Sequence, residues 1–217
     1  MKKIHFLSVD QLCRLTVGSL ALVLISACSV LRPAATAHPA FYSLNASRTA
    51  AVIAAPTGAP TLIINPPHAA AGFDSQRIIY VRQTHKLEYF AHSEWVEPPA
   101  RLLTPLLVAA IENTGAFHAV VMTPSAAAGD FRLDTEIIRL QQEFQTQPSR
   151  VRFTLRAYLT DIKTRRVLAR REFAGDAAAN SDDPYGGVVA ANLAVQTVLD
   201  ELSAFCAAAV RNAPREK

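Results

Sequence analysis

The sequence predicts an α/β fold, a single-domain sandwich in which a mixed β-sheet is covered by two main helices. Residues 151–160 alternate between apolar and polar side chains, which is typical of a strand with one buried and one solvated face. Residues 188–206 instead place apolar side chains three and four positions apart, the spacing of an amphipathic helix. The 217 residues, 50% hydrophobic and 18% charged, suffice for one such domain and exclude a disordered or collagen-like chain.

Short strands around one helix are expected in the first half of the domain. Apolar, β-rich runs predict strands, and the turn 84–86 between two of them predicts a hairpin. Leu side chains at helical spacing predict a helix that Gly115 ends, with Pro105 either delaying its start or kinking it. The Ala-rich segment 46–60 is expected to be a loop. In chain order, the sequence predicts strands at 41–44, 61–64, 77–82 and 87–91, a helix at 100–114, and a strand at 117–122.

Three long strands and one long helix are expected in the second half. Asp183 before Pro184 predicts a helix start, because Asp caps free backbone N–H groups and Pro is tolerated at the first helical position. The apolar stripe of this helix continues to Cys206, so the helix is expected to pack along the sheet. The alternating patterns predict strands at 131–137, 151–160 and 167–173, with a polar connection at 142–149 and a hairpin turn at 161–165.

The N-terminus has the pattern of a secretory signal peptide. Positive charge precedes an apolar run at 15–25, which is shorter than the roughly 20 residues of a transmembrane helix. Small side chains stand directly before Cys28, and residues 25–28 resemble the lipobox of bacterial lipoproteins, in which the Cys thiol is acylated. We therefore predict that Cys28 carries lipid and attaches the chain to a membrane. No later stretch is expected to cross a bilayer.

The predicted organisation of the chain follows from this N-terminus. Ser29, directly after the acylated Cys, resembles the sorting position of lipoproteins destined for the outer membrane. The expected location is the periplasmic face of that membrane. The predicted parts are a signal peptide at 1–27, a Pro- and Ala-containing lipidated tether at 28–40, a folded domain at 41–210 and a C-terminal tail at 211–217.

Charge and cysteine content bear on partners and disulfides. The formal net charge is +4, but the first 27 residues hold two of those charges, so nucleic acid is not an expected partner. Cys13 leaves with the signal peptide and Cys28 carries lipid, which leaves Cys206 as a free thiol in the core and predicts no disulfide. The sequence leaves the oligomeric state open, a homo-oligomer included.

The sequence contains no recognisable catalytic, cofactor-binding or metal-binding motif. It has no Gly-rich phosphate loop, no nucleophile elbow, and no pair of His or Cys residues at metal-ligand spacing. Asp182 and Asp183 are interpreted as helix-capping residues. The arginines of segment 165–171 are either solvated edge charge or a contact for anionic lipid headgroups or an acidic partner. We predict a protein that is not an enzyme and that needs no cofactor.

Aromatic side chains concentrate in the segment that holds the predicted hairpin. Tyr80, Tyr89, Phe90 and Trp95 lie within sixteen positions, and Arg82 stands among them. Core packing accounts for one or two of these rings, whereas an amphipathic cluster beside a polar loop is also the usual composition of an interface. Both interpretations stay open, and the five residues are the candidates for contact with a partner.

The same region resembles a known family. Residues 73–82, 87–90 and 95–99, followed by the Leu-rich helix, are similar to ABC-type transport auxiliary lipoproteins, which include the paraquat-inducible lipoprotein type. The lipobox, the tether and residues 41–44 also resemble the start of that family, so the resemblance covers roughly residues 41–210. It implies a non-enzymatic periplasmic component that works with an MCE-domain protein and an ABC transporter permease in moving phospholipid or other hydrophobic compounds.

Two further functions compete with a transport role. A structural or assembly lipoprotein of the cell envelope, with no part in transport, is the alternative from a different class. A periplasmic hydrolase is disfavoured, because no nucleophile and base are recognisable as a pair.

Overall fold

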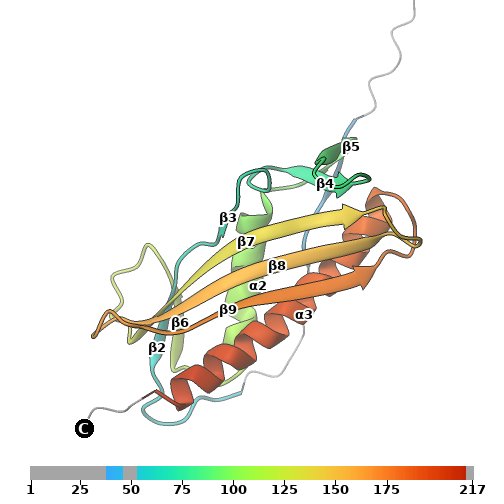
Figure 1. Cartoon of the computed structure of the whole chain (residues 1–217). Coiled ribbons are helices and arrows are strands. Elements are labelled where there is room, and N and C mark those ends of the chain that lie inside the picture. Colours follow the sequence, from blue (N-terminus) through green and yellow to red (C-terminus); the bar gives the residue numbers. More distant parts are fainter. Residues whose placement is uncertain (1–37, 46–52, 214–217) are drawn as a thin grey trace, which may run out of the picture. The chain divides into compact units, whose positions relative to one another are not determined.

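Three long antiparallel strands form the centre of the fold: β7 (Phe131–Glu143), β8 (Arg150–Asp161) and β9 (Val167–Ala178) (Figure 1). The computed structural model describes residues 38–45 and 53–213, and Pro39–Lys217 forms one compact unit. Leu155 lies opposite Ile137 on one side and Phe173 on the other. All three side chains are at most 1% exposed. The period-2 pattern of the sequence therefore marks the buried face of the sheet, as predicted.

Shorter strands complete a mixed nine-stranded sheet along the other edge of β7. Successive parts of β7 pair in parallel with β2 (Thr61–Ile64), β3 (His68–Ala69) and β4 (Arg77–Val81). The sheet continues from β2 to β6 (Ala119–Met122), and from β4 through β5 (Glu88–Trp95) to β1 (Ala40–Tyr42). Strands β1, β4 and β5 consequently lie at the Glu143 end of β7, and β2 and β6 lie at its Phe131 end.

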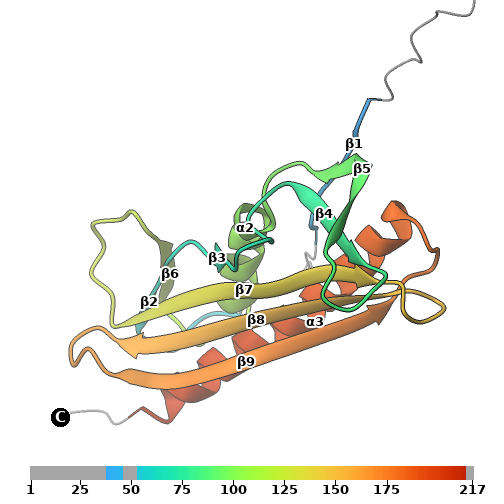
Figure 2. The same ribbon diagram turned by 45° about the horizontal axis from the view of Figure 1, so that its top comes forward.

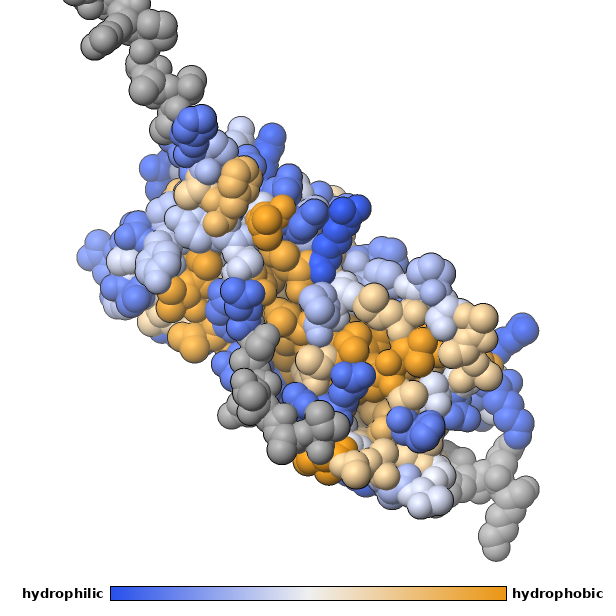
Figure 3. Space-filling model, turned by 180° about the vertical axis from the view of Figure 1, so that it is seen from behind, coloured by the Kyte–Doolittle hydropathy of each residue, from blue (hydrophilic) through white to orange (hydrophobic). Residues whose placement is uncertain are grey.

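Two helices, α2 (Pro99–Glu112) and α3 (Pro184–Arg211), cover one face of this sheet (Figures 1 and 2). The Asp183 carboxylate accepts a hydrogen bond from the Gly186 N–H at 2.7 Å, which confirms the predicted cap. Gly175 of β9 lets α3 approach closely, since a Cβ at this position would lie 2.3 Å from the Ala194 carbonyl oxygen. Seen from the side opposite to that of Figure 1, hydrophobic residues form patches that hydrophilic residues interrupt (Figure 3).

The core lies between the helices and the sheet. Its fully buried helical side chains include Leu103, Leu107 and Ile111 of α2 and Val195, Val198 and Leu202 of α3. By length and composition α3 is apolar enough to cross a membrane, although no stretch after the N-terminus was expected to be. Here its apolar side is packed on the sheet, so it forms the core helix of the domain. Pro39–Lys217 contains every residue of this core and therefore folds without the preceding segment.

Several element boundaries differ from the prediction, and three strands run well beyond it. Strand β5 continues to Trp95 instead of ending at 91, β7 continues to Glu143, and β9 continues to Ala178. The predicted polar connection at 142–149 was wrong at its start: Gln142 pairs with Val151 and is only 2% exposed. Helix α2 begins at Pro99 and contains Pro105, so Pro105 does not delay its start, the first of the two effects predicted for it.

Several predicted parts fall outside the described residues. These are the signal peptide at 1–27, Cys28, most of the tether, part of the loop at 46–60, and the last four residues of the tail. Segment 43–45, directly after β1, is fixed to α3. The Asn192 side chain accepts a hydrogen bond from the Asn45 N–H and donates one to the Ser43 carbonyl oxygen. The chain that enters through β1 is thus held by both the sheet and the long helix.

Candidate partner-binding surface

The β4–β5 hairpin carries the predicted aromatic segment and shows different side chains on its two faces. Ile79 lies opposite Tyr89, and Tyr80 lies opposite Glu88. Because alternate residues of a strand point to opposite faces, Tyr80, Glu88 and Phe90 share one face, and Ile79 and Tyr89 share the other. The hairpin itself confirms the predicted pairing of these two strands.

Three rings form an aromatic cluster on the first face: Tyr80, Phe90 and Phe144. The centroid of Tyr80 lies 4.5 Å from that of Phe90 and 5.7 Å from that of Phe144. Phe144 directly follows β7, and its N–H donates a hydrogen bond to the Val81 carbonyl oxygen at 2.9 Å. Sequence reasoning missed Phe144, because it fell within the expected polar connection. Tyr80 and Phe90 are half-buried, so this cluster stiffens the hairpin from one side.

Arg82 stabilises the end of the hairpin through an ion pair with Glu88. Its Nε donates to Glu88 Oε2 at 3.0 Å, and its Nη2 contacts the second carboxylate oxygen. The guanidinium carbon also lies 5.5 Å from the centroid of Tyr80. The hydrogen bond from Arg82 lowers the pKa of Glu88 and outweighs the desolvation of the carboxylate. Arg82 keeps 60% of its side chain exposed, so its charge remains available at the surface.

The second face carries a groove of about 460 Å³, which we call the hairpin groove. Its floor and walls include Ile79, Leu87 and Tyr89, and the last two are 49% and 50% exposed. The Arg77 guanidinium stacks 4.2 Å from the centroid of Tyr89 and holds that ring in place. Exposed apolar side chains beside charged ones are the composition of a protein interface. The full lining is Gly72, Asp74, Ser75, Arg77, Ile79, Leu87, Glu88 and Tyr89.

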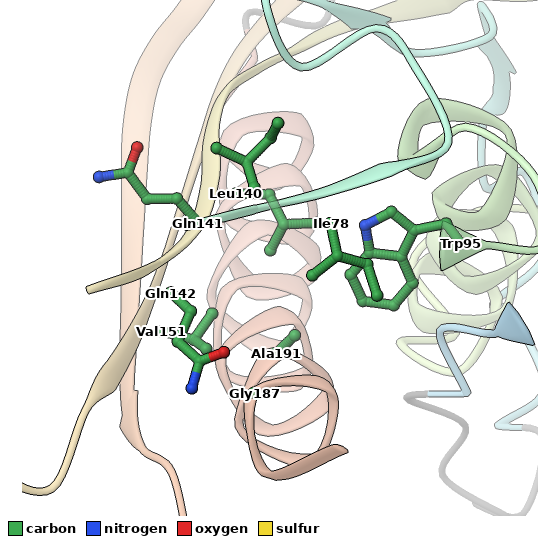
Figure 4. A pocket seen from close by; sticks show the side chains of 9 residues that line it. Ile78, Trp95, Leu140, Gln141, Gln142, Val151, Gly187 and Ala191 are labelled. Carbon is green, nitrogen blue, oxygen red and sulfur yellow. The ribbon is translucent and has the colours of Figure 1, made fainter. Parts of the chain in front are cut away.

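Trp95 does not belong to this surface. It is 2% exposed and packs in the core close to Ile78 and Leu140 (Figure 4). The space between these side chains is about 10 Å³, room for about one water molecule. The amide oxygen of Gln142, which also lines this space, has no hydrogen-bond partner in the described part of the chain. The structure thus brings Tyr80, Arg82, Tyr89 and Phe90 together at the hairpin and assigns Trp95 to its support.

A family comparison identifies the chain. The model of the ABC-type transport auxiliary lipoprotein component matches residues 42–203, three quarters of the sequence and the whole of the hairpin. The chain belongs to this family. The resemblance found in the sequence is thereby confirmed, and the family is an auxiliary component of transport and not an enzyme family. Membership also implies association with a transporter and a membrane-associated place in the cell envelope.

Solved structures share the fold of this auxiliary lipoprotein. Protein XCC0632 from Xanthomonas campestris has a TM-score of 0.70 at 24% identity, over 79% of this chain and 96% of that chain. Protein CT253 from Chlamydia trachomatis has a TM-score of 0.50 at 8% identity, over 69% of this chain and 96% of that chain. The comparison with curated proteins gives no match. At these identities the likeness establishes the fold alone.

The remaining candidate residues of the auxiliary lipoprotein have structural roles. Cys206 is a fully buried free thiol, and burial raises its pKa to about 12. Asp182 does not cap α3. It accepts a hydrogen bond from the Ser149 N–H at 2.8 Å and ties the β7–β8 turn to the helix start. Among residues 38–45 and 53–213, no three His, Cys, Asp or Glu side chains are grouped as a metal site.

Proposed function

We propose that this auxiliary lipoprotein is attached through acylated Cys28 to the periplasmic face of the outer membrane. There it serves, without catalysis of its own, an MCE-type ABC transport system that moves phospholipid or other hydrophobic compounds. Membership of the transport auxiliary family carries this proposal. The lipobox-like residues 25–28 support the anchor. ATP hydrolysis belongs to other subunits in this scheme, because the sequence has no recognisable nucleotide-binding motif.

The hairpin groove is the surface that we assign to the MCE-domain protein or the permease. Its exposed Tyr89 and Leu87 supply apolar area, and Arg77 and Arg82 supply charge beside them. The aromatic cluster on the other face and Trp95 in the core keep the hairpin rigid, which lowers the entropy cost of binding.

Site-specific crosslinking in cells tests the assigned surface. A photo-reactive residue replaces Tyr89, and the matched control replaces Leu193 of α3, which is equally exposed at 52%. At native expression we expect the Tyr89 position, and not the Leu193 position, to capture an MCE-domain protein or the permease. Equal capture at both positions would remove the hairpin groove as the interface. Capture of cell-wall or outer-membrane assembly proteins alone would favour the structural lipoprotein.

The anchor has a separate test. We expect Cys28→Ala to abolish incorporation of labelled fatty acid and to remove the protein from the outer-membrane fraction. Cys13→Ala is the matched control, since Cys13 also precedes the folded domain but lacks the lipobox residues. A Cys28→Ala protein that keeps both label and location contradicts the anchor without touching the hairpin groove.

A further inference from the structure

The β8–β9 tip, residues 162–167, lies at the end of the molecule farthest from the hairpin groove. Asp161 of β8 lies opposite Phe131, whereas β4 pairs with the other end of β7 at Gln142 and Glu143. Thirteen residues of β7 separate the two ends, about 40 Å at about 3.3 Å per residue. Figure 2 shows the tip protruding at the left, with the β4–β5 hairpin at the right.

The tip combines exposed aliphatic side chains with unpaired guanidinium groups. Ile162 and Val167 are 37% and 58% exposed. Arg165 and Arg166 between them are exposed, and neither has an ion-pair partner in the described part of the chain. Four arginines of the open sheet face instead pair with carboxylates: Arg132 with Asp134, Arg150 with Asp176, Arg152 with Glu143, and Arg156 with Glu136.

The two carboxylates nearest the tip are engaged by backbone groups. Asp161 accepts a hydrogen bond from the Thr164 N–H at 2.7 Å, which lowers its pKa and fixes the turn. The Asp130 carbonyl oxygen accepts a hydrogen bond from the Ile162 N–H, and the Asp130 carboxylate accepts one from the Thr61 N–H. Arg165 adopts the left-handed region with φ of 58°, so the turn is tight and projects both arginines into solvent. Both carboxylates keep their negative charge, but the three basic residues of the tip, Lys163, Arg165 and Arg166, outnumber them, so the tip keeps an excess of positive charge.

We infer that the β8–β9 tip binds the surface of an anionic phospholipid membrane. Arginines attract the headgroup phosphates, and the flanking Ile162 and Val167 enter the boundary with the acyl chains. A protein partner fits less well, because a stable protein interface buries about 800 Å² per partner. A six-residue turn does not offer that area, whereas a lipid surface needs no matching shape. The inference is independent of the anchor at Cys28 and of the hairpin groove.

Vesicle binding tests the inference on the compact unit 39–217, which lacks the signal peptide and the acylated residue. The probe is a vesicle of phosphatidylglycerol and phosphatidylcholine in equal parts, compared with phosphatidylcholine alone. We expect partition to the anionic vesicle only, weakening as salt rises. Each Arg near an anionic surface contributes about fivefold to partition, so Arg165→Gln with Arg166→Gln should lower it about 25-fold.

Two further variants separate insertion from net charge. Arg150→Gln with Arg152→Gln removes the same charge at the opposite end of β8, outside the hairpin groove, and should leave partition within about twofold of the wild type. Ile162→Ser with Val167→Ser keeps the charge and should lower partition about tenfold, because the aliphatic contact is lost. The fluorescence of Trp95, 2% exposed in the core, reports whether each variant is folded.

Three results overturn the inference. The wild-type unit does not bind anionic vesicles, or the Arg150 and Arg152 variant loses as much binding as the tip variant. In the third result, the tip binds soluble polyglutamate as tightly as vesicles, and the Ile162 and Val167 variant keeps full vesicle partition. That result would indicate that the tip binds an acidic protein instead of a membrane.

Discussion

Replacement of Gly175 by Ala should destabilise the protein by about 2–3 kcal/mol, because β9 and α3 touch through their backbones at this point. A Cβ on Gly175 would lie 2.3 Å from the carbonyl oxygen of Ala194 and 3.0 Å from Val198 Cγ2. The carbonyl belongs to the middle of a helix, so no side-chain rotation can relieve the contact. The helix has to move away from the sheet.

The size of that movement sets the magnitude. An ordinary contact between such atoms is about 3.4 Å, so α3 must move away from the sheet by about 1 Å. A gap of that size removes about a quarter to a half of the dispersion energy of each contact that it opens. Overpacking of this kind costs about 1–3 kcal/mol, and the rigid partner favours the upper end. Ala also restricts the unfolded chain more than Gly does, and this entropy effect stabilises the folded state by about 0.4–1 kcal/mol. The expected net loss is about 2–3 kcal/mol.

Urea unfolding followed by the fluorescence of Trp95, the only Trp in the chain, measures this loss. The matched control is Ala174→Ser, which also adds one heavy atom but at an exposed position of β9, and should change the unfolding free energy by less than about 0.5 kcal/mol. A Gly175→Ala protein that is as stable as the control refutes the close approach of α3 to the sheet.

Three further predictions concern single side chains. Trp95→Ala should lower the unfolding free energy by about 3–5 kcal/mol, because Trp95 lies in the core. Tyr89→Ala should lower it by about 1 kcal/mol or less, because Tyr89 is half-exposed. Urea unfolding measures both losses. Burial raises the pKa of Cys206 to about 12, so a thiol reagent at about pH 8 should modify Cys206 only after denaturation; modification of the native protein refutes its burial. The pKa of Glu88 lies below its ordinary value, so its pairing with Arg82 stabilises the fold at neutral pH and is lost on acidification. Glu88→Gln should therefore lose less stability than the wild type between about pH 7 and about pH 3.

The sequence predicted most elements because their patterns are local. Strand β8 alternates over its whole length, and the structure extends the predicted range by one residue at each end. The Asp183 cap needs only three neighbouring residues and was correct for the same reason. Gly115 was predicted to end a helix from its own backbone chemistry, and it lies outside α2.

The predictions failed where the environment of a residue depends on a partner far away in the sequence. Gln142 looks like a loop residue, but it pairs with Val151 and donates to the Ser149 hydroxyl at 2.9 Å. Phe144 joins Tyr80 only because β4 and β7 meet in parallel, a pairing that no local pattern encodes. For Trp95 the sequence left core and interface open, and its burial beside Gly187 and Ala191 of α3 makes it a core residue.

The separation of the two candidate surfaces follows from one structural fact, the length of β7. Its Glu143 end holds β4, β5 and β1, so the hairpin groove lies beside the point where the chain enters the domain. Its Phe131 end holds the β8–β9 tip. Residues so far apart share no contacts, so changes at one end should add to changes at the other without coupling. A partner at the groove and a lipid surface at the tip can consequently be bound at the same time, and the rigid β7–β9 ribbon between them fixes their distance.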